Sequence, residues 1–261
     1  MSSYQNILLS TTNNIATITL NRPDVFNAFN DEQSYELQDA LKQVMRDKEV
    51  RVIVLTGAGK AFCSGQDLKA ISGAKNRSLS DSLYKRYNPI IKAMRNMPKP
   101  IICMLNGVAA GAGCSLALAS DFIVASEKAS LIEVFVNVGL VLDSGSSYFL
   151  PRVVGSARAF EMATMASKIS AQEALTLGIV NRVCAAEDLE NTTLEIATYY
   201  ANAPTKAIGL IKGMLNKSTY SDLESMLQYE AYCQEIAGNS DDYKEGVAAF
   251  NEKRKANFTG N

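Results

Sequence analysis

The longest uncharged stretch of the chain, residues 101–120 (IICMLNGVAAGAGCSLALAS), constrains the fold more than any other segment. Its length would suit a membrane-spanning helix, but Asn106 and three glycines interrupt it. A short buried strand, a glycine turn and a helix of small residues explain the pattern better. The stretch therefore predicts a strand over 101–105 and a helix over 111–119, in a protein that does not associate with membranes.

Strands and helices alternate on both sides of this stretch, which is typical of an α/β protein. Residues Ile15–Leu20 (IATITL) alternate apolar and polar side chains, as a strand does. Residues 50–56 (VRVIVLT) are mostly apolar and β-branched, which predicts a strand buried on both faces. Asp31 is expected to cap an amphipathic helix that runs to about residue 47. The other predicted elements are helices over 78–97 and 171–177, strands over 122–125 and 179–183, and helices from about residue 189 onward.

The absence of histidine restricts the chemistry. None of the 261 residues is a histidine, so neither a Ser-His-Asp triad nor a histidine-ligated zinc site can form, and we expect no metal. Proton transfer near neutral pH must use a carboxyl, lysine, tyrosine or cysteine side chain with a shifted pKa. The 26 basic and 27 acidic residues give a net charge of -1, which indicates no binding to nucleic acid.

The cysteines indicate the compartment. Their number is odd and no two of them form a CxxC motif, so reduced core thiols are expected, with a reactive thiol as the alternative. The polar residues 1–14 lack the apolar core of a signal peptide. The five cysteines are Cys63, Cys103, Cys114, Cys184 and Cys233. From the cysteines and the N-terminal residues we expect a cytoplasmic protein.

Two junctions between a strand and a helix are rich in glycine and small residues. They are residues 61–68 (AFCSGQDL) and 106–114 (NGVAAGAGC). Backbone N–H groups at the start of a helix have no partner within the helix, and the helix dipole gives them partial positive charge. Two such turns that face each other could hold a developing oxyanion. The alternative is that the glycines only let the helices pack closely.

The runs KAFCSGQDLK and NGVAAGAGCSLALASDF, at this spacing, resemble the crotonase (enoyl-CoA hydratase/isomerase) superfamily. The resemblance covers essentially the whole chain, including NRPDVFNAF, ISAQEALTLGIVNRV and DDYKEGVAAFNEKRKANFTG. It implies an α/β fold with a crotonase-like spiral of ββα turns over residues 1–197 and a C-terminal helical trimerisation region over 198–261. The implied substrate is an acyl-CoA thioester, and the implied assembly is a homotrimer or a dimer of trimers. No cofactor is expected, because coenzyme A is part of the substrate.

The resemblance also implies site residues. The backbone N–H groups of Gln66 and Ala112 would form the oxyanion hole around the thioester carbonyl. Lysines that face the CoA phosphates would be Lys60, Lys69 and, from a neighbouring subunit, Lys253, unless these are ordinary solvated lysines. The other expected CoA contacts are Ala61, Cys63, Asp67, Leu68 and Phe250, and the expected acyl-pocket residues are Tyr84, Tyr87, Asn88, Ser115 and Phe135.

Asp143 is the candidate general base. It follows the apolar run 138–142, where burial would raise its pKa towards neutrality. The alternative is that Asp143 caps a helix beginning at residue 144. The resemblance favours catalysis, because several isomerases of the superfamily have their single carboxylate here. The two glutamates of the hydratases are replaced by Ser115 and Phe135.

The expected activity is isomerisation of a CoA thioester, in which Asp143 removes the proton alpha to the carbonyl. The pieces KRYNP, GLVLDSG and AGNSDDYKEGVAAF are similar to isomerases of aerobic phenylacetate degradation. That similarity implies conversion of ring-1,2-epoxyphenylacetyl-CoA to oxepin-CoA, and the same base would serve to shift 3-enoyl-CoA to 2-enoyl-CoA. Two alternatives stay open. One is an enoyl-CoA hydratase that uses Glu133, which on a strand would share a face with Phe135, and the other is a non-catalytic acyl-CoA-binding protein.

Overall fold

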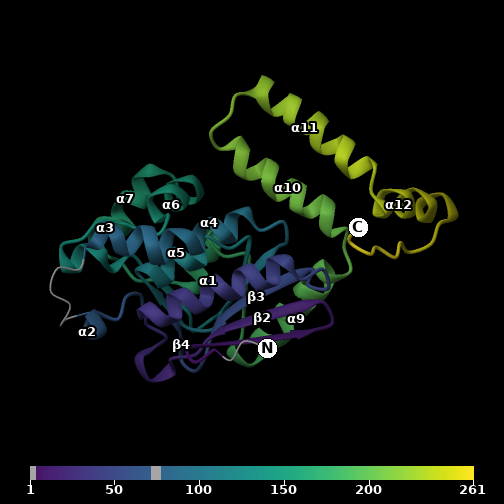
Figure 1. Ribbon diagram of the computed structural model, residues 1–261. Helices are drawn as coiled ribbons and strands as arrows, with labels where there is room; N and C mark the ends of the chain where they lie inside the picture. The colour runs from purple at the N-terminus through teal and green to yellow at the C-terminus, as the bar shows by residue number, and fades with distance from the viewer. Residues whose placement is uncertain (1–3, 72–77) are drawn as a thin grey trace.

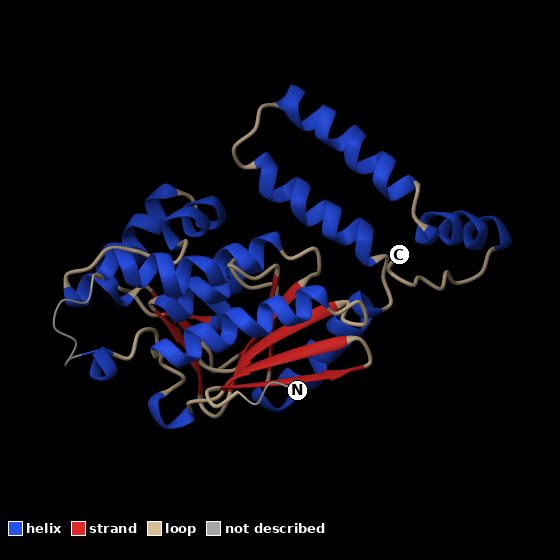
Figure 2. Cartoon of the chain, viewed as in Figure 1, coloured by secondary structure: helices blue, strands red, loops and turns tan. Residues whose placement is uncertain are grey.

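The α/β part of the chain is built on a six-stranded sheet with the order β1-β2-β3-β5-β7-β10 (Figure 2). The structure is a computed structural model, and it describes residues 4–71 and 78–261. β1 and β2 form an antiparallel hairpin, and every later strand of this sheet is added in parallel. The strands are β1 (Ile7–Thr12), β2 (Ile15–Leu20), β3 (Val52–Gly57), β5 (Ile101–Leu105), β7 (Phe122–Ser126) and β10 (Arg182–Cys184).

A smaller sheet supplies the second strand of each structural repeat. Its order is β4-β6-β8-β9, and its strands are two or three residues long. Along the chain, β3 is followed by β4, β5 by β6 and β7 by β8, and a helical segment follows each pair. This repeat confirms the expected α/β spiral of ββα turns. The strands are β4 (Ala61–Cys63), β6 (Val108–Ala110), β8 (Ser130–Ile132) and β9 (Ile169–Ser170).

Two helices cover opposite faces of the larger sheet, and β3 shows why its sequence is apolar throughout. Ile53 and Leu55 belong to the core cluster that includes α1 (Asp31–Arg46). The alternate residues Val52 and Val54 belong to the cluster that includes α9 (Leu189–Ala201). Successive side chains of a strand point to opposite faces, so all six residues of β3 are buried. The prediction of a strand buried on both faces is confirmed.

The start of α1 differs by one residue from the expectation. Asn30, rather than Asp31, is the N-cap, and its side chain accepts a hydrogen bond from the Gln33 N–H at 2.9 Å. Both residue types are good caps, so the residue pattern alone could not distinguish them. The helix expected over 171–177 begins after Ser170, whose hydroxyl accepts a hydrogen bond from the Glu173 N–H at 3.2 Å.

The helix expected over 78–97 is divided into α3, a π-helical turn η2 and α4. Pro89 follows the π turn and has no N–H to continue an α-helical ladder. The Gln38 side chain of α1 donates to the Lys85 and Arg86 oxygens at 3.0 and 3.1 Å. These bonds satisfy carbonyls at the irregularity, which a helical periodicity could not predict. The segments are α3 (Leu79–Ser82), η2 (Leu83–Tyr87) and α4 (Asn88–Asn96).

The last three helices extend away from the sheets, as Figure 1 shows. They are α10 (Thr205–Ser218), α11 (Leu223–Gly238) and α12 (Asp241–Glu252). The expected boundary between residues 197 and 198 falls inside α9, and the division into two regions stays a prediction. The strand expected over 179–183 is observed as β10, which is shorter than expected and begins later, at Arg182. The remaining helical segments are η1 (Pro23–Val25), α2 (Leu68–Ile71), α5 (Ala112–Leu118), η3 (Val134–Val138), α6 (Ser146–Val154), α7 (Ser156–Met165), α8 (Ala171–Thr176) and η4 (Ala186–Asp188).

Asp121 ties α10 to the sheet. Its carboxylate accepts from the Ile101 N–H at 2.8 Å, from Lys212 at 2.6 Å and from Arg95 at 3.1 Å. Lys212 lies on α10 with 7% of its side chain exposed, and it also donates to the Met94 oxygen at 2.8 Å. A buried ammonium group of this kind depends on its carboxylate partner.

Within residues 4–71 and 78–261, no helix has the length and apolar character needed to cross a bilayer.

We predict that Asp121→Ala lowers the free energy of unfolding by about 3 kcal/mol or more, because it leaves Lys212 buried without its counter-charge. Urea unfolding monitored by circular dichroism measures the change. Asp241→Ala is the matched control, because the Asp241–Lys244 pair is largely exposed and should contribute nothing measurable. Equal stability of the two variants would contradict the assigned role of Asp121.

Candidate functional site

Glycines let two backbone turns pack against each other beside the smaller sheet. A Cβ at Gly113, in the first turn of α5, would come within 2.2 Å of the Cys63 oxygen on β4. Gly65 has a φ of +94°, and a Cβ there would come within 2.9 Å of the Ala110 oxygen. The two predicted glycine junctions therefore face each other in close contact, and both positions require glycine.

Each turn presents one backbone N–H group. Phe29 donates to the Gly65 oxygen at 2.7 Å and accepts from the Asp67 N–H at 2.9 Å. In this parallel bridge the N–H of Gln66 points away from Phe29. Ala112 is the first residue of α5, so its N–H has no acceptor within the helix. Gln66 and Ala112 line the same pocket, and their role as an oxyanion hole stays a prediction.

The two turns border a pocket with a volume of about 330 Å³. Its other walls come from α3 and η2 on one side and from η3 and the loop 139–143 on the other. Most of the wall is apolar, which suits the acyl part of a ligand. The apolar side chains include Leu68, Leu79, Leu83, Val134, Val138 and Leu142.

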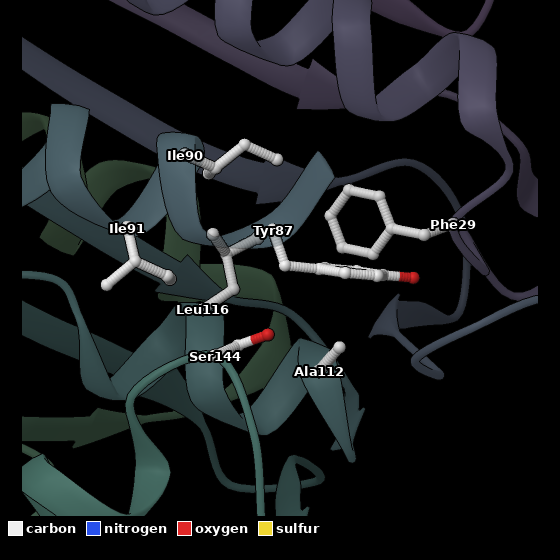
Figure 3. A pocket seen from close by; sticks show the side chains of 7 residues that line it. All are labelled: Phe29, Tyr87, Ile90, Ile91, Ala112, Leu116 and Ser144. Atoms are coloured by element: carbon white, nitrogen blue, oxygen red, sulfur yellow. The ribbon is translucent and has the colours of Figure 1, made fainter. Parts of the chain in front are cut away.

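Tyr87 lies between this pocket and a second cavity of about 10 Å³, and it lines both. Figure 3 shows its ring beside Phe29, with the Ser144 hydroxyl on the side of Ala112. The two rings pack edge to face, with their centroids 5.6 Å apart. The Tyr87 hydroxyl donates to the Gln66 side chain, which donates in turn to the Phe29 oxygen at 2.8 Å. These contacts fix the turn that carries the Gln66 N–H.

Asp143 is the one carboxylate among the described residues that line the larger pocket. Burial raises its pKa, and the Ser144 hydroxyl, which donates to Oδ1 at 2.8 Å, opposes the rise. α6 begins at Ser146 with Gly145 at its N-cap and no side-chain cap. The alternative that Asp143 caps a helix from residue 144 is therefore wrong.

Glu133 is a second acidic side chain, buried behind the pocket wall with 1% exposure. Burial raises its pKa to about 7, the Asp143 charge adds to the rise, and the Ser146 hydroxyl and the Cys114 thiol oppose it. The sequence suggested that Glu133 could share a strand face with Phe135. That expectation is wrong, because the chain leaves β8 at Ile132 and enters the 3-10 helix η3 at Val134.

The structure brings some of the expected site residues together and separates others. Tyr84 is 71% exposed, so its side chain points into solvent rather than into the acyl pocket. Asn88, at the start of α4, does not line the pocket either. Ser115 is fully buried and forms hydrogen bonds behind the wall. The expected residues that do line the pocket are Gln66, Leu68, Tyr87, Ala112, Phe135 and Asp143.

The expected CoA contacts have different surroundings. Lys60, Lys69 and Lys253 are exposed. Ala61 and Cys63 are buried in β4, and burial raises the pKa of the Cys63 thiol to about 12. These two residues can therefore offer a ligand only their backbone.

The other expected CoA contacts are charged or remote. Asp67 forms an ion pair with Arg22 at 3.0 Å, so its carboxylate already has a cationic partner. Phe250 is 84% exposed on α12, which lies far from α3 in Figure 1. A contact from Phe250 or Lys253 to CoA would thus involve the pocket of a neighbouring subunit, as the resemblance implied for Lys253.

Several wall residues were not anticipated from the sequence. Leu79 and Leu83 are spaced by four residues, a spacing that places them on one face of a helix. Val134, Val138 and Leu140 belong to the apolar segment that precedes Asp143. These two patterns were signals that could have identified the wall.

Two backbone donors and one half-buried carboxyl around an apolar pocket define a class of enzyme site that can hold an oxyanion beside a base. Comparisons with known proteins show the family. The family model described as enoyl-CoA hydratase/isomerase matches residues 10–261. The chain belongs to this family, which is also called the crotonase family.

Individual relatives carry both isomerase and hydratase names. The chain is 42% identical to 1,2-epoxyphenylacetyl-CoA isomerase of Escherichia coli strain K12, over 94% of this chain and 95% of that protein. It is 40% identical to a probable enoyl-CoA hydratase of Rhodobacter capsulatus, over 99% of both chains. The crystal structure of an enoyl-CoA hydratase from Bacillus anthracis superposes with a TM-score of 0.94 at 34% identity, covering 98% of this chain and 100% of that one.

We predict that Gly65→Ala lowers kcat for an enoyl-CoA substrate by about tenfold or more, because the new Cβ separates the two donor turns. Gly155→Ala is the control. Gly155 also has a positive φ, of +77°, but an added Cβ there meets nothing within 4 Å. Steady-state kinetics and thermal unfolding of both variants distinguish loss of the site from backbone strain. Equal kcat in the two variants would show that the spacing of the turns is unimportant.

Proposed function

We propose that the protein is an acyl-CoA isomerase in which Asp143 is the catalytic base. The observation that carries this proposal is that Asp143 is the one carboxylate on the described wall of a pocket bordered by both donor turns. Moving a proton from one carbon to another needs one group that accepts the proton and returns it. Adding water needs additional groups that position and activate the water.

The proposed reaction begins when Asp143 removes the proton alpha to the thioester carbonyl. Negative charge then develops on the thioester oxygen, where the N–H groups of Gln66 and Ala112 stabilise it. One such donor is typically worth about 3 kcal/mol of activation free energy. Burial raises the pKa of Asp143, which makes it a stronger base than an exposed aspartate. The protonated Asp143 finally returns the proton to another carbon.

Two substrate classes fit this chemistry. One is ring-1,2-epoxyphenylacetyl-CoA, whose enolate leads to the seven-membered oxepin ring, and the name of the Escherichia coli relative supports it. The other is a 3-enoyl-CoA, in which Asp143 would return the proton at C4 to give the 2-enoyl-CoA. The apolar wall suits an aromatic ring or an alkyl chain. No cofactor is required, because coenzyme A is part of either substrate.

An enoyl-CoA hydratase is the second candidate, supported by the name of the Rhodobacter capsulatus relative. Against it, Glu133 does not line the pocket, and Ser115 and Phe135 stand where the family's hydratases have glutamates. A non-catalytic acyl-CoA-binding protein would keep both turns and would not depend on Asp143.

We also propose that the C-terminal helices form subunit contacts in a homotrimer or a dimer of trimers. Several large apolar side chains on these helices are at least half exposed, which is typical of surfaces that are covered in an assembly. The exposed side chains include Ile211, Leu215, Leu223, Leu227, Tyr232 and Phe250.

We further propose a cytoplasmic location, which fits the five free cysteines.

We predict that Asp143→Asn slows isomerisation by about 100-fold or more while leaving CoA-ester binding intact. The measurement is proton exchange at C2 and C4 of a 3-enoyl-CoA in heavy water, followed by NMR. Wild-type exchange that persists in Asp143→Asn would exclude Asp143 as the base. Net hydration of crotonyl-CoA by the wild type would instead support an enoyl-CoA hydratase. Binding of the CoA ester without proton exchange would support a non-catalytic acyl-CoA-binding protein.

We predict that Ser144→Ala moves the acid side of the kcat/KM profile to higher pH. The Ser144 hydroxyl stabilises ionised Asp143, so its loss raises the pKa of Asp143 further. Because the base must be ionised, the rate then falls at low pH and is unchanged well above the pKa. Ser64→Ala is the control, since Ser64 lines the same pocket but donates to the Val25 oxygen. Identical profiles for both variants would contradict the prediction.

A further inference from the structure

A chain of hydrogen-bonded side chains lies behind the pocket wall. Ser146 Oγ lies 2.8 Å from Glu133 Oε1 and 2.7 Å from Ser115 Oγ. Ser115 Oγ lies 3.1 Å from the backbone oxygen of Asp143 and 3.2 Å from that of Gly111. The three side chains are buried. This series of hydrogen bonds links Glu133 to the backbone of Asp143, the proposed base, and to Gly111, which precedes Ala112. None of its three side chains lines the pocket.

The number of protons decides the direction of these bonds. A serine hydroxyl has one proton to donate, and two hydroxyl oxygens 2.7 Å apart must share one. When Glu133 is ionised, Ser146 donates to it and Ser115 must donate to Ser146, so the Asp143 oxygen loses its donor. When Glu133 is protonated, its own hydroxyl donates to Ser146 and Ser146 donates to Ser115, so the Ser115 proton becomes available to the Asp143 oxygen at 3.1 Å, with the Gly111 oxygen at 3.2 Å as the competing acceptor.

We propose that Glu133 is a positioning residue that acts in its protonated form, directing Ser146 and Ser115 so that a hydrogen bond holds the backbone of Asp143 against α5. This inference rests on the proposed function, because it gives Glu133 its role through the catalytic base. Glu133 touches neither the substrate nor the reacting atoms.

The surroundings of Glu133 favour the neutral form. Its Oε2 oxygen makes no hydrogen bond of normal geometry, which is costly for a buried ionised oxygen and much less so for a neutral carboxyl. The titratable groups that face it are the Cys114 thiol of α5 and Asp143. Burial and the Glu133 charge raise the pKa of Cys114, so its thiol stays neutral. The thiol opposes the rise of the Glu133 pKa as a hydrogen-bond donor, but it carries no positive charge that could balance an ionised Glu133. The negative charge of Asp143, present when it acts as a base, further favours a proton on Glu133.

The first test is the pH profile of kcat for 3-enoyl-CoA isomerisation. Wild-type kcat should fall on the alkaline side as Glu133 loses its proton. In Glu133→Gln the amide can donate to Ser146 at every pH, so the alkaline fall should disappear while kcat at the optimum stays within about threefold. Ser146→Ala should also remove the alkaline fall, because Ser115 then keeps its proton for the Asp143 oxygen, whereas Ser115→Ala should lower kcat by about tenfold at an unchanged KM, because it removes the donor to that oxygen.

Ser130→Ala is the matched control. Ser130 is as buried as Ser146 and lies on β8 near Glu133, and its hydroxyl has no hydrogen-bond partner. Its substitution should leave kcat, KM and the pH profile unchanged. An alkaline fall that persists in Glu133→Gln, or a Ser146→Ala variant that matches Ser130→Ala, would overturn the proposal.

A second measurement does not depend on turnover. The infrared carbonyl stretch of a protonated carboxylic acid should be present in the wild-type protein near neutral pH and absent in Glu133→Gln, and Asp143→Asn should retain it. A wild-type spectrum without this band overturns the role of Glu133. Loss of turnover in Asp143→Asn together with a wild-type profile in Glu133→Gln overturns this inference alone, whereas full turnover in Asp143→Asn overturns the proposed function.

Discussion

The close contact between two glycine turns is the constraint on which the site depends. Gly113 lets α5 lie directly on β4, and Gly65 brings its own turn against β6. Neither approach is possible with a Cβ, so the distance between the two donor N–H groups is set by backbone packing. The same packing places Gly111 against Val134 and Phe135, which begin the opposite wall. The pocket, the donors and the loop of Asp143 are thus arranged around one contact.

Features that depend on local pattern could be predicted from the sequence. The strand Ile15–Leu20 and the buried strand β3 followed from the spacing of apolar residues, and the donor turns followed from glycine and small residues. Features that depend on contacts between distant segments could not. The π turn at η2 comes before Pro89 and is supported by Gln38 of another helix. Tyr84 lies on that turn, and its side chain points into solvent instead of the pocket.

The two acidic residues near the site differ in position, and their proposed roles follow from that difference. Asp143 lines the pocket and is only half-buried, so a substrate can reach it. Glu133 is ten residues earlier in the chain, yet η3 and the pocket wall cover it. The apolar run before Asp143 and the family resemblance favoured Asp143 over Glu133. The burial of Glu133 behind the wall could not be predicted, because it arises where β8 ends and η3 begins. In the proposed mechanism, a neutral carboxylic acid and an ionised one together provide the two protonation states of the site in a chain without histidine.

The proposed donors in the pocket are backbone groups, whereas its walls are made of side chains from α3, η2, η3 and the loop 139–143. Substitution of a wall residue such as Leu79, Val138 or Leu142 would change the shape offered to the proposed acyl group and leave both N–H groups in place. Recognition and chemistry can therefore be changed separately in this scaffold. A library confined to these wall positions would sample new acyl specificities on a constant reaction centre, and the same separation would let a family diversify its substrates by drift in the wall alone.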